Sequence, residues 1–247
     1  MAGTKLIYQT DPTISTGLCC AWTVPDNVYK VTFEIWGGGG GGGTPGSSCT
    51  CSDSGGPGTG GGYAKKTIDV TPGTVYTVCA ASGGVSASGY GSVCARCCNG
   101  CAGGTSFVTG TNLVNFCATG GQGGRSDFNT VCYSWCGCQF SDMTGGTGYN
   151  GDMVATGSRG YKGVYGNGSP YNVDIHGGNA AGPGGGAGGR NFGLGYNNVG
   201  GGDAATSPSM HGEFPGGGGA GSGCYSWCQC TALNSGRGAH GLVKITY

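Results

Sequence analysis

The stretch Val28-Tyr-Lys-Val-Thr-Phe-Glu-Ile-Trp36 is followed directly by seven consecutive glycines, residues 37–43. Val31, Phe33 and Ile35 alternate with polar residues, which is typical of a half-buried β-strand. Glycine weakens the interior of a strand because it has no side chain to pack against a neighbour. We therefore expect a strand over residues 28–36 whose pairing ends where the glycine run begins.

Further strands are predicted near both ends of the chain, and no amphipathic helix of useful length is visible. Trp22-Thr-Val-Pro25 should end a strand or lie at a sheet edge, because Pro25 cannot donate to a ladder. Proline followed by glycine in Thr71-Pro-Gly73 is typical of a type II turn, so we expect residues 63–70 and 74–80 to form a hairpin. The remaining strand candidates are residues 5–8, 105–107, 113–118 and 241–247.

Glycine supplies 62 of the 247 residues, about one in four against a usual share of roughly one in fourteen. Ordering so many glycines costs conformational entropy, and we expect that an apolar content of 36% does not offset that cost alone. The 16 cysteines could supply the missing stability as disulfides. An ordinary globular enzyme is therefore improbable.

The charges exclude some further classes of protein. Only 9% of the residues are charged, with 11 Lys and Arg against 11 Asp and Glu, so no basic field is available for nucleic acid. No apolar run is long enough to span a membrane, and the first twenty residues lack the apolar core of a secretory signal. We expect synthesis in the cytoplasm, no membrane span and no nucleic-acid partner.

Catalysis has little support in the sequence. His176, His211 and His240 lie in glycine-flanked loops, and the eleven carboxylates include no close pair of the kind that glycosidases use. None of the glycine runs has the Gly-Lys-Ser/Thr ending of a phosphate-binding loop. We predict no enzymatic activity, no catalytic residues and no cofactor.

Residues 139–223 are rich in Gly, Asn, Tyr and Ser. A flexible linker is one interpretation. We favour ordered loops, because polyglycine can adopt the three-residue polyproline-II helix, and only glycine lets such helices approach closely enough for hydrogen bonds between their backbones. Residues 141–222 are predicted to form an exposed recognition surface, with tyrosines suited to stacking on sugars or other polar groups. The alternative is that these tyrosines only cover glycine-rich backbone. The recognition candidates are Tyr149, Tyr161, Tyr165, Tyr171 and Tyr196.

The cysteines are spread over many loops and include a repeated heptad, Cys132-Tyr-Ser-Trp-Cys136-Gly-Cys138 and Cys224-Tyr-Ser-Trp-Cys228-Gln-Cys230. Cys94/Cys97 and Cys98/Cys101 have the two-residue spacing of zinc or iron–sulfur ligands, so a metal site is one interpretation. We favour disulfides, because no histidine lies at ligand spacing beside these clusters. The other candidates for pairing are Cys19, Cys20, Cys49, Cys51, Cys79 and Cys117.

Several motifs in order resemble the glycine-rich domain of bacteriophage tail and tail-fibre proteins. They are Trp22-Thr-Val-Pro25 with residues 28–43, then Gly60-Gly-Gly-Tyr-Ala-Lys-Lys-Thr-Ile-Asp-Val-Thr-Pro-Gly73, Gly103-Gly-Thr-Ser-Phe107, Ala118-Thr-Gly-Gly-Gln-Gly-Gly124 and the final Gly241-Leu-Val-Lys-Ile-Thr-Tyr247. The resemblance covers roughly residues 20–124 and 238–247. It implies an all-β fold, with a β-sandwich-like base formed by N- and C-terminal strands and with long, polyproline-II-like glycine-rich loops.

We expect a base formed by residues 1–124 and 231–247, and a loop region over residues 125–230 bounded by the two repeated heptads. The resemblance implies a virion protein, a tail-fibre or tail-tip adhesin whose partners are other virion proteins and a glycan or protein of the host surface, with a homotrimer expected by analogy. A head-decoration protein and a glycine-rich extracellular or ice-binding protein are the alternatives. The family is usually poor in cysteine, and 247 residues leave little room for a fibre shaft, so a small standalone subunit or a distal tip is expected.

Overall fold

The computed structural model describes residues 3–11, 14–44, 55–87, 99–125, 143–165, 172–192, 210–222 and 234–247. All the regular elements in these ranges are β-strands, as predicted. They are β1 Thr4–Ile7, β2 Leu18–Thr23, β3 Lys30–Trp36, β4 Tyr63–Asp69, β5 Val75–Ala80, β6 Ser106–Gly110, β7 Leu113–Ala118, β8 Gly148–Tyr149, β9 Met153–Ala155, β10 Tyr161–Tyr165, β11 Asn172–His176, β12 Arg190–Phe192 and β13 Leu242–Thr246.

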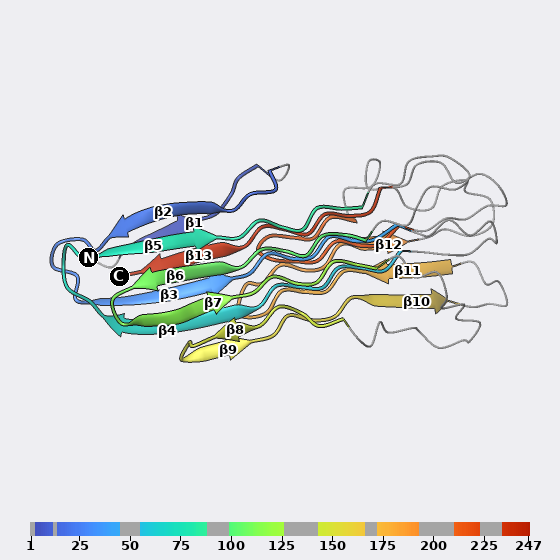
Figure 1. Ribbon diagram of the computed structural model, residues 1–247. Coiled ribbons are helices and arrows are strands. Elements are labelled where there is room, and N and C mark those ends of the chain that lie inside the picture. Colours follow the sequence, from blue (N-terminus) through green and yellow to red (C-terminus); the bar gives the residue numbers. More distant parts are fainter. Residues whose placement is uncertain are drawn as a thin grey trace.

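Two five-stranded antiparallel sheets form a sandwich at one end of the molecule, which we call the base (Figure 1). One sheet has the order β1-β13-β3-β4-β9, and the other has the order β2-β5-β6-β7-β8. The last strand of the chain lies between β1 and β3, so the two termini meet in the same sheet. The base is therefore built from strands of both chain ends, as the sequence predicts.

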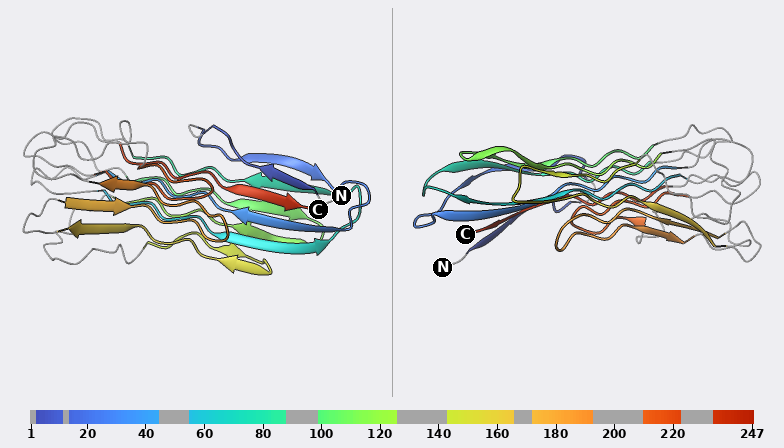
Figure 2. Two further views of the ribbon diagram at one scale, coloured as in Figure 1. Left: turned by 180° about the vertical axis from the view of Figure 1, so that it is seen from behind. Right: turned by 90° about the horizontal axis from the view of Figure 1, so that it is seen from below.

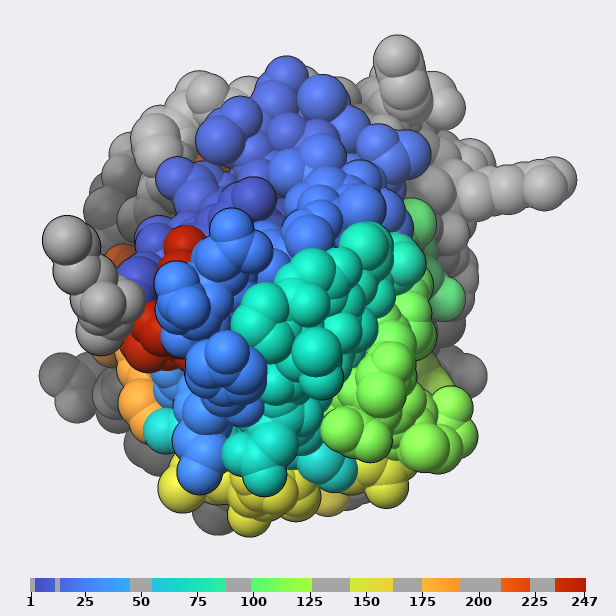
Figure 3. All heavy atoms as spheres, turned by 90° about the vertical axis from the view of Figure 1, so that its left-hand side faces the viewer, coloured from blue at the N-terminus to red at the C-terminus, as the bar shows by residue number. Residues whose placement is uncertain are grey.

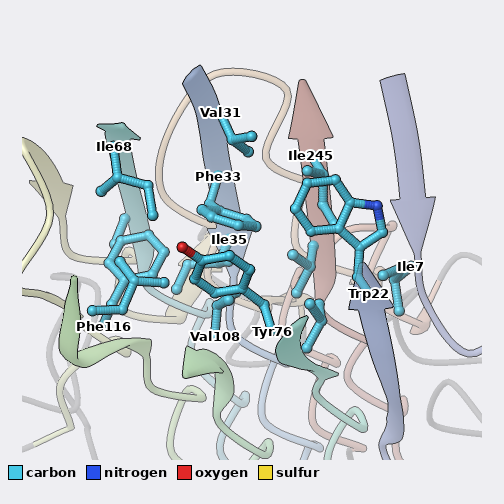
Figure 4. Packing of buried hydrophobic residues seen from close by; sticks show 14 of the residues in the cluster. Ile7, Trp22, Val31, Phe33, Ile35, Ile68, Tyr76, Val108, Phe116 and Ile245 are labelled. Carbon is cyan, nitrogen blue, oxygen red and sulfur yellow. The ribbon is translucent and has the colours of Figure 1, made fainter. Parts of the chain in front are cut away.

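The core of the base lies between the two sheets (Figure 4). Val31, Phe33 and Ile35 of β3 are fully buried, at 0% exposure, which confirms the alternation in the sequence. Trp22 of β2 packs edge-on against Phe33, with ring centroids 5.9 Å apart, and Tyr76 of β5 lies 5.6 Å from the same ring. Aromatic side chains bury the largest areas of any residue, so this cluster supplies much of the apolar burial that the base achieves.

The predicted hairpin around Thr71-Pro-Gly73 is wrong. β4 pairs with β3 and β9, whereas β5 pairs with β2 and β6 in the opposite sheet. The turn itself forms, since the Thr74 N–H donates to the Thr71 carbonyl and Gly73 has a φ of 82°. Type II turns splay their flanking strands instead of matching the twist of a hairpin, so this turn carries the chain from one sheet to the other.

Most strands of the base continue directly into glycine-rich segments (Figure 1). Residues 37–43 follow β3. Their N–H groups donate hydrogen bonds to three neighbouring segments in turn, so that every third N–H group donates to the same segment. The N···O distances are 2.8 to 3.1 Å. The accepting segments run antiparallel to residues 37–43 and are residues 55–62, 100–104 and 235–239.

The carbonyl groups of residues 38–43 accept hydrogen bonds in the same rotation from three parallel segments. These are residues 81–87, 119–125 and 216–222, and the N···O distances are again 2.8 to 3.1 Å. The run of glycines is thus a threefold extended helix of the polyproline-II type with six hydrogen-bonded neighbours. We call this arrangement the glycine bundle, and Figure 2 shows it from two further sides.

Close approach explains why the sequence uses glycine here. A Cβ atom on Gly38, Gly39, Gly40, Gly41 or Gly42 would lie 1.9 to 2.2 Å from a carbonyl oxygen of a parallel neighbour, well inside van der Waals contact. Residues 37–43 end the sheet but not the hydrogen bonding, which corrects the expectation that pairing stops at the glycine run. Within residues 143–165, 172–192 and 210–222 the interpretation as ordered loops is confirmed, and that of a flexible linker is wrong.

The division of the chain into a base and a loop region stays a prediction. The structure shows that the base also contains two strands from the sequence of the predicted loop region. β8 and β9 fall within residues 125–230, yet β8 pairs with β7 and β9 pairs with β4 at the edges of the two base sheets. Their turn is held on β4 by Asp152, whose carboxylate accepts the Thr67 N–H at 2.8 Å. The base therefore also takes a hairpin from the central part of the sequence.

We expect the Gly40→Ala substitution to destabilise the protein strongly. The new methyl group would lie 1.9 Å from the Gln122 carbonyl oxygen, which belongs to backbone on an inner segment that cannot rotate away. Overpacking of this kind typically costs about 1–3 kcal/mol or more. Chemical denaturation followed by circular dichroism measures the change in the free energy of unfolding.

Gly104→Ala is the matched control, because its Cβ would meet no atom closer than 3.3 Å. It should cost no more than about 1 kcal/mol, which is the scale of a tolerated small change in packing. Equal stabilities of the two variants would contradict the close packing of the bundle.

Candidate functional site

The described segments of the bundle are mostly glycine, so most of the chemically varied side chains of the described residues lie outside it. Figure 3 looks onto the end of the base, where the turns that join β2 to β3, β4 to β5 and β6 to β7 lie side by side. At about 3.1 Å per residue, the seven glycines at 37–43 span roughly 20 Å between the base and the other end. We call that other end the far end.

Several segments of the bundle are hydrogen-bonded to one another at the far end. The Gly55 N–H donates to the Ser222 carbonyl at 2.8 Å, and the Gly56 N–H donates to the Arg125 carbonyl at 2.7 Å. Ser235 donates its N–H to the Ala87 carbonyl at 3.2 Å. Residues that are up to 180 positions apart in the sequence, such as 55 and 235, therefore lie at one end of the bundle.

The intervals of sequence between these end residues carry most of the cysteines. They are residues 45–54, 88–98, 126–142 and 223–233, which lie outside the described residues. The cysteines in these intervals are Cys49, Cys51, Cys94, Cys97, Cys98, Cys132, Cys136, Cys138, Cys224, Cys228 and Cys230. Cys101 is described, is exposed, and accepts a hydrogen bond from the Gly41 N–H at its carbonyl oxygen.

One of the predicted disulfides is present in the base, where Cys19 of β2 and Cys79 of β5 stand opposite each other and are bonded. The bond crosses the outer face of the sheet and closes a separation of 60 residues. Cys20, Cys101 and Cys117 have no disulfide partner among the described residues. Burial raises the pKa of the Cys117 thiol, so this thiol is less reactive than a free one. Pairing of the remaining cysteines stays a prediction.

The predicted recognition tyrosines divide between the two ends. Tyr149, 48% exposed, is on β8 in the base, opposite Cys117. Tyr161, 40% exposed, begins β10 of the three-stranded sheet β10-β11-β12, and its ring lies 6.3 Å from that of His176. Tyr165 ends β10, while Tyr171 and Tyr196 lie outside the described residues. Of the two tyrosines whose side chains are described, only Tyr161 belongs to the glycine-rich half.

Polar side chains that the sequence analysis did not select hold the bundle in register. Thr59 is fully buried, and its hydroxyl accepts the Gln122 N–H at 2.7 Å and donates to the Thr144 carbonyl at 3.0 Å. Ser235, also fully buried, donates to the carbonyls of Gly42 and Ala87. The isolation of Thr59 within a glycine run was the available signal, but a lone threonine does not reveal its distant partners, and Ser235 stands in no such run.

Two of the three histidines have the same structural role. Nδ1 of His240 accepts the Gly83 N–H at 2.9 Å, and Nε2 lies 3.0 Å from the Asp11 carbonyl. Nδ1 of His211 accepts the Arg237 N–H at 3.0 Å. Acceptance at Nδ1 requires the neutral imidazole, in which the proton is on Nε2. Both rings thus accept hydrogen bonds from backbone N–H groups within the molecule.

The carboxylate of Glu34 is held in a polar cluster on the outer face of the first sheet. Tyr63 donates to Oε1 at 2.9 Å, and the Lys244 ammonium lies 3.1 Å from Oε2. Burial opposes ionisation, but the hydrogen bonds from Lys244 and Tyr63 keep the pKa of Glu34 below its ordinary value. Burial and Glu34 raise the pKa of Tyr63, so the phenol stays protonated and serves as a structural donor.

Within the described ranges, no group of three or more His, Cys, Asp and Glu side chains is placed to bind a metal ion. No helix in those ranges is long and apolar enough to cross a bilayer.

The sequence as a whole matches a family model described as a glycine-rich domain, over residues 13–247. The chain belongs to this glycine-rich domain family. The match also includes residues 125–237 and the glycine bundle. No match was found among curated proteins.

Acidification should destabilise the bundle through His211. Burial, together with the charge of Arg237, lowers the pKa of His211 in the folded protein. The unfolded chain then binds the proton more tightly, so this contribution to stability is present above the ordinary pKa of about 6.5 and is lost as the pH falls below it. Thermal unfolding between about pH 7 and pH 5 measures the loss.

His211→Asn is the matched variant, since the amide oxygen can accept the Arg237 N–H without titrating. Its melting temperature should fall less steeply with decreasing pH than that of the native chain. Identical slopes would show that protonation of His211 does not oppose folding.

Proposed function

We propose that this chain is a virion protein of a bacteriophage tail, without enzymatic activity, that contacts the host surface with the far end of its glycine bundle. The observation that carries the proposal is the separation of the two ends. The base gathers the chain termini and a packed core, and at the far end backbone hydrogen bonds bring together residues that are next in sequence to the cysteine-rich intervals. An attachment module and a contact module at opposite ends of a rod suit an adhesin.

The glycine bundle suits this role because its backbone is held on all sides. Residues 37–43 donate to three neighbours and accept from three others, so a rod can form with little side-chain packing. Loops that carry binding residues work best when a rigid scaffold positions them. Variation in the sequence of the intervals would then change what is contacted without changing the scaffold.

Aromatic and amide side chains suit the proposed contact. Tyr161 is exposed on β10, and the sequence of residues 193–209, which lie outside the described residues, includes Tyr196, Asn197 and Asn198. Tyrosine provides rigid amphipathic contact area, and asparagine provides hydrogen bonds, which together suit a glycan or a polar protein surface. The base would face the other virion proteins.

An ice-binding or extracellular structural protein is the second candidate, since the bundle of polyglycine helices is the feature expected of it. The bundle of this chain is joined to a β-sandwich, which a purely structural stack does not require. The virion assignment provides a role for both the sandwich and the bundle.

Immunogold labelling of intact particles tests the proposal. An epitope inserted in residues 193–209 should label the tail of particles whose genome encodes the chain, and antibody bound there should block adsorption to the host. The same epitope in the turn at Thr71-Pro-Gly73 of the base is the matched control. If other virion proteins cover the base, antibody to this epitope should not bind intact particles, and if the turn is accessible, bound antibody should leave adsorption intact. Label over the whole head would support a decoration protein, and absence of label from particles would reject both virion roles.

A further inference from the structure

The edge of β2 is the longest exposed edge in the base. Among the described residues β2 pairs with β5 through six consecutive positions, Leu18 to Thr23, and with no strand on its other side. The strand Leu-Cys-Cys-Ala-Trp-Thr contains no charge and no proline, and its register with β5 has no bulge. Exposed strand edges of this kind are ready templates for pairing with another chain.

The open backbone groups of β2 can be assigned from the turn that follows it. Both groups of Val24 point toward β5, because its N–H donates to the Thr74 carbonyl at 2.9 Å and its carbonyl accepts the Gly73 N–H at 2.9 Å. Orientation alternates along an antiparallel strand. The N–H and carbonyl groups of Cys19, Ala21 and Thr23 therefore point to the open side.

The other edges of the two base sheets are protected. β1 is four residues long. Its Lys5 lies on the same face as the buried Ile7, so the lysine places a charge on the inner side of this sheet edge. β8 and β9 are two and three residues long. Short edge strands and inward-pointing charges are the usual devices against edge-to-edge association. β2 has none of these devices, which indicates that its edge is covered in the functional protein.

We propose that the edge of β2 pairs with β2 of a second copy of this chain, antiparallel about a twofold axis at Ala21. The three open residues are symmetric about Ala21, so Ala21 would lie opposite its counterpart and Cys19 opposite the counterpart of Thr23. Each of these pairs exchanges both backbone hydrogen bonds. The result is one continuous sheet across two base domains, with a self-complementary interface of the kind that twofold dimers require.

The side chains of β2 permit this pairing. Ala21 is small and exposed at the centre, and Cys19 is held by its disulfide to Cys79 on the same outer face. On the inner face Trp22 would lie beside the counterpart of Cys20 and extend the buried cluster. Since β2 carries no charge, two copies meet without repulsion between the strands.

Light scattering coupled to size-exclusion chromatography tests the proposal on the full chain. The native protein should elute with twice the mass of the chain. Ala21→Lys should be a monomer, because two like charges would face each other across the axis. Its fold should be as stable as that of the native monomer, because position 21 is exposed. Thr109→Lys is the matched control, since Thr109 is exposed in the same row of the sheet two strands away, and it should remain a dimer.

Charge complementation at the axis provides the sharpest test. Ala21→Lys and Ala21→Glu should each be monomeric, and an equimolar mixture of the two should recover the dimer, since position 21 would then face an opposite charge. A native monomer, a native trimer, or an Ala21→Lys protein that stays dimeric would overturn the proposal. None of these results depends on whether the chain belongs to a virion.

Discussion

The N–H and carbonyl groups of residues 37–43 are bonded to six other segments of the chain, and this bonding is the constraint on which the architecture depends. Backbone hydrogen bonds of 2.8 to 3.1 Å in three directions require helix axes so close together that no Cβ fits between them. An unpaired buried backbone group is costly, so each neighbour must also be extended and rich in glycine. The high glycine content of the bundle segments follows from this one packing geometry.

Register is the second requirement of such a bundle. A threefold polyglycine helix looks the same after a shift of three residues, so glycine alone does not fix which residues face each other. Thr59 and Ser235 remove this ambiguity, because each has a buried hydroxyl that bonds to specific backbone groups of other segments. His211 and His240 act similarly from the ring nitrogen. The few polar residues of the bundle therefore specify the alignment, while the glycines permit the contact.

Sequence reasoning succeeded where side chains alternate. The period of two in the sequence predicted strands β3 and β13 and the buried face of β3. Apolar residues at every second position all lie on one face of a strand, and that face packs against the core. It failed for the pairing of β4 and β5, because a Pro-Gly turn marks a reversal of the chain without saying which sheet receives the next strand. The six neighbours of residues 37–43 were also hidden, as a run of glycine carries no periodic signal. Of the candidate site, Cys19 and Cys79 were foreseen as disulfide cysteines but not as partners, and Thr59 was missed because its partners are distant in the sequence.

Hydrogen–deuterium exchange of the backbone amides tests the central claim most directly. A run of seven glycines in a flexible loop exchanges at nearly the rate of an unfolded peptide. The bonding described above predicts instead that the amides of residues 38–42 are among the slowest to exchange in the chain, comparable with those of β3 in the core of the base. Fast exchange at these glycines, with slow exchange retained in β3, would contradict the glycine bundle.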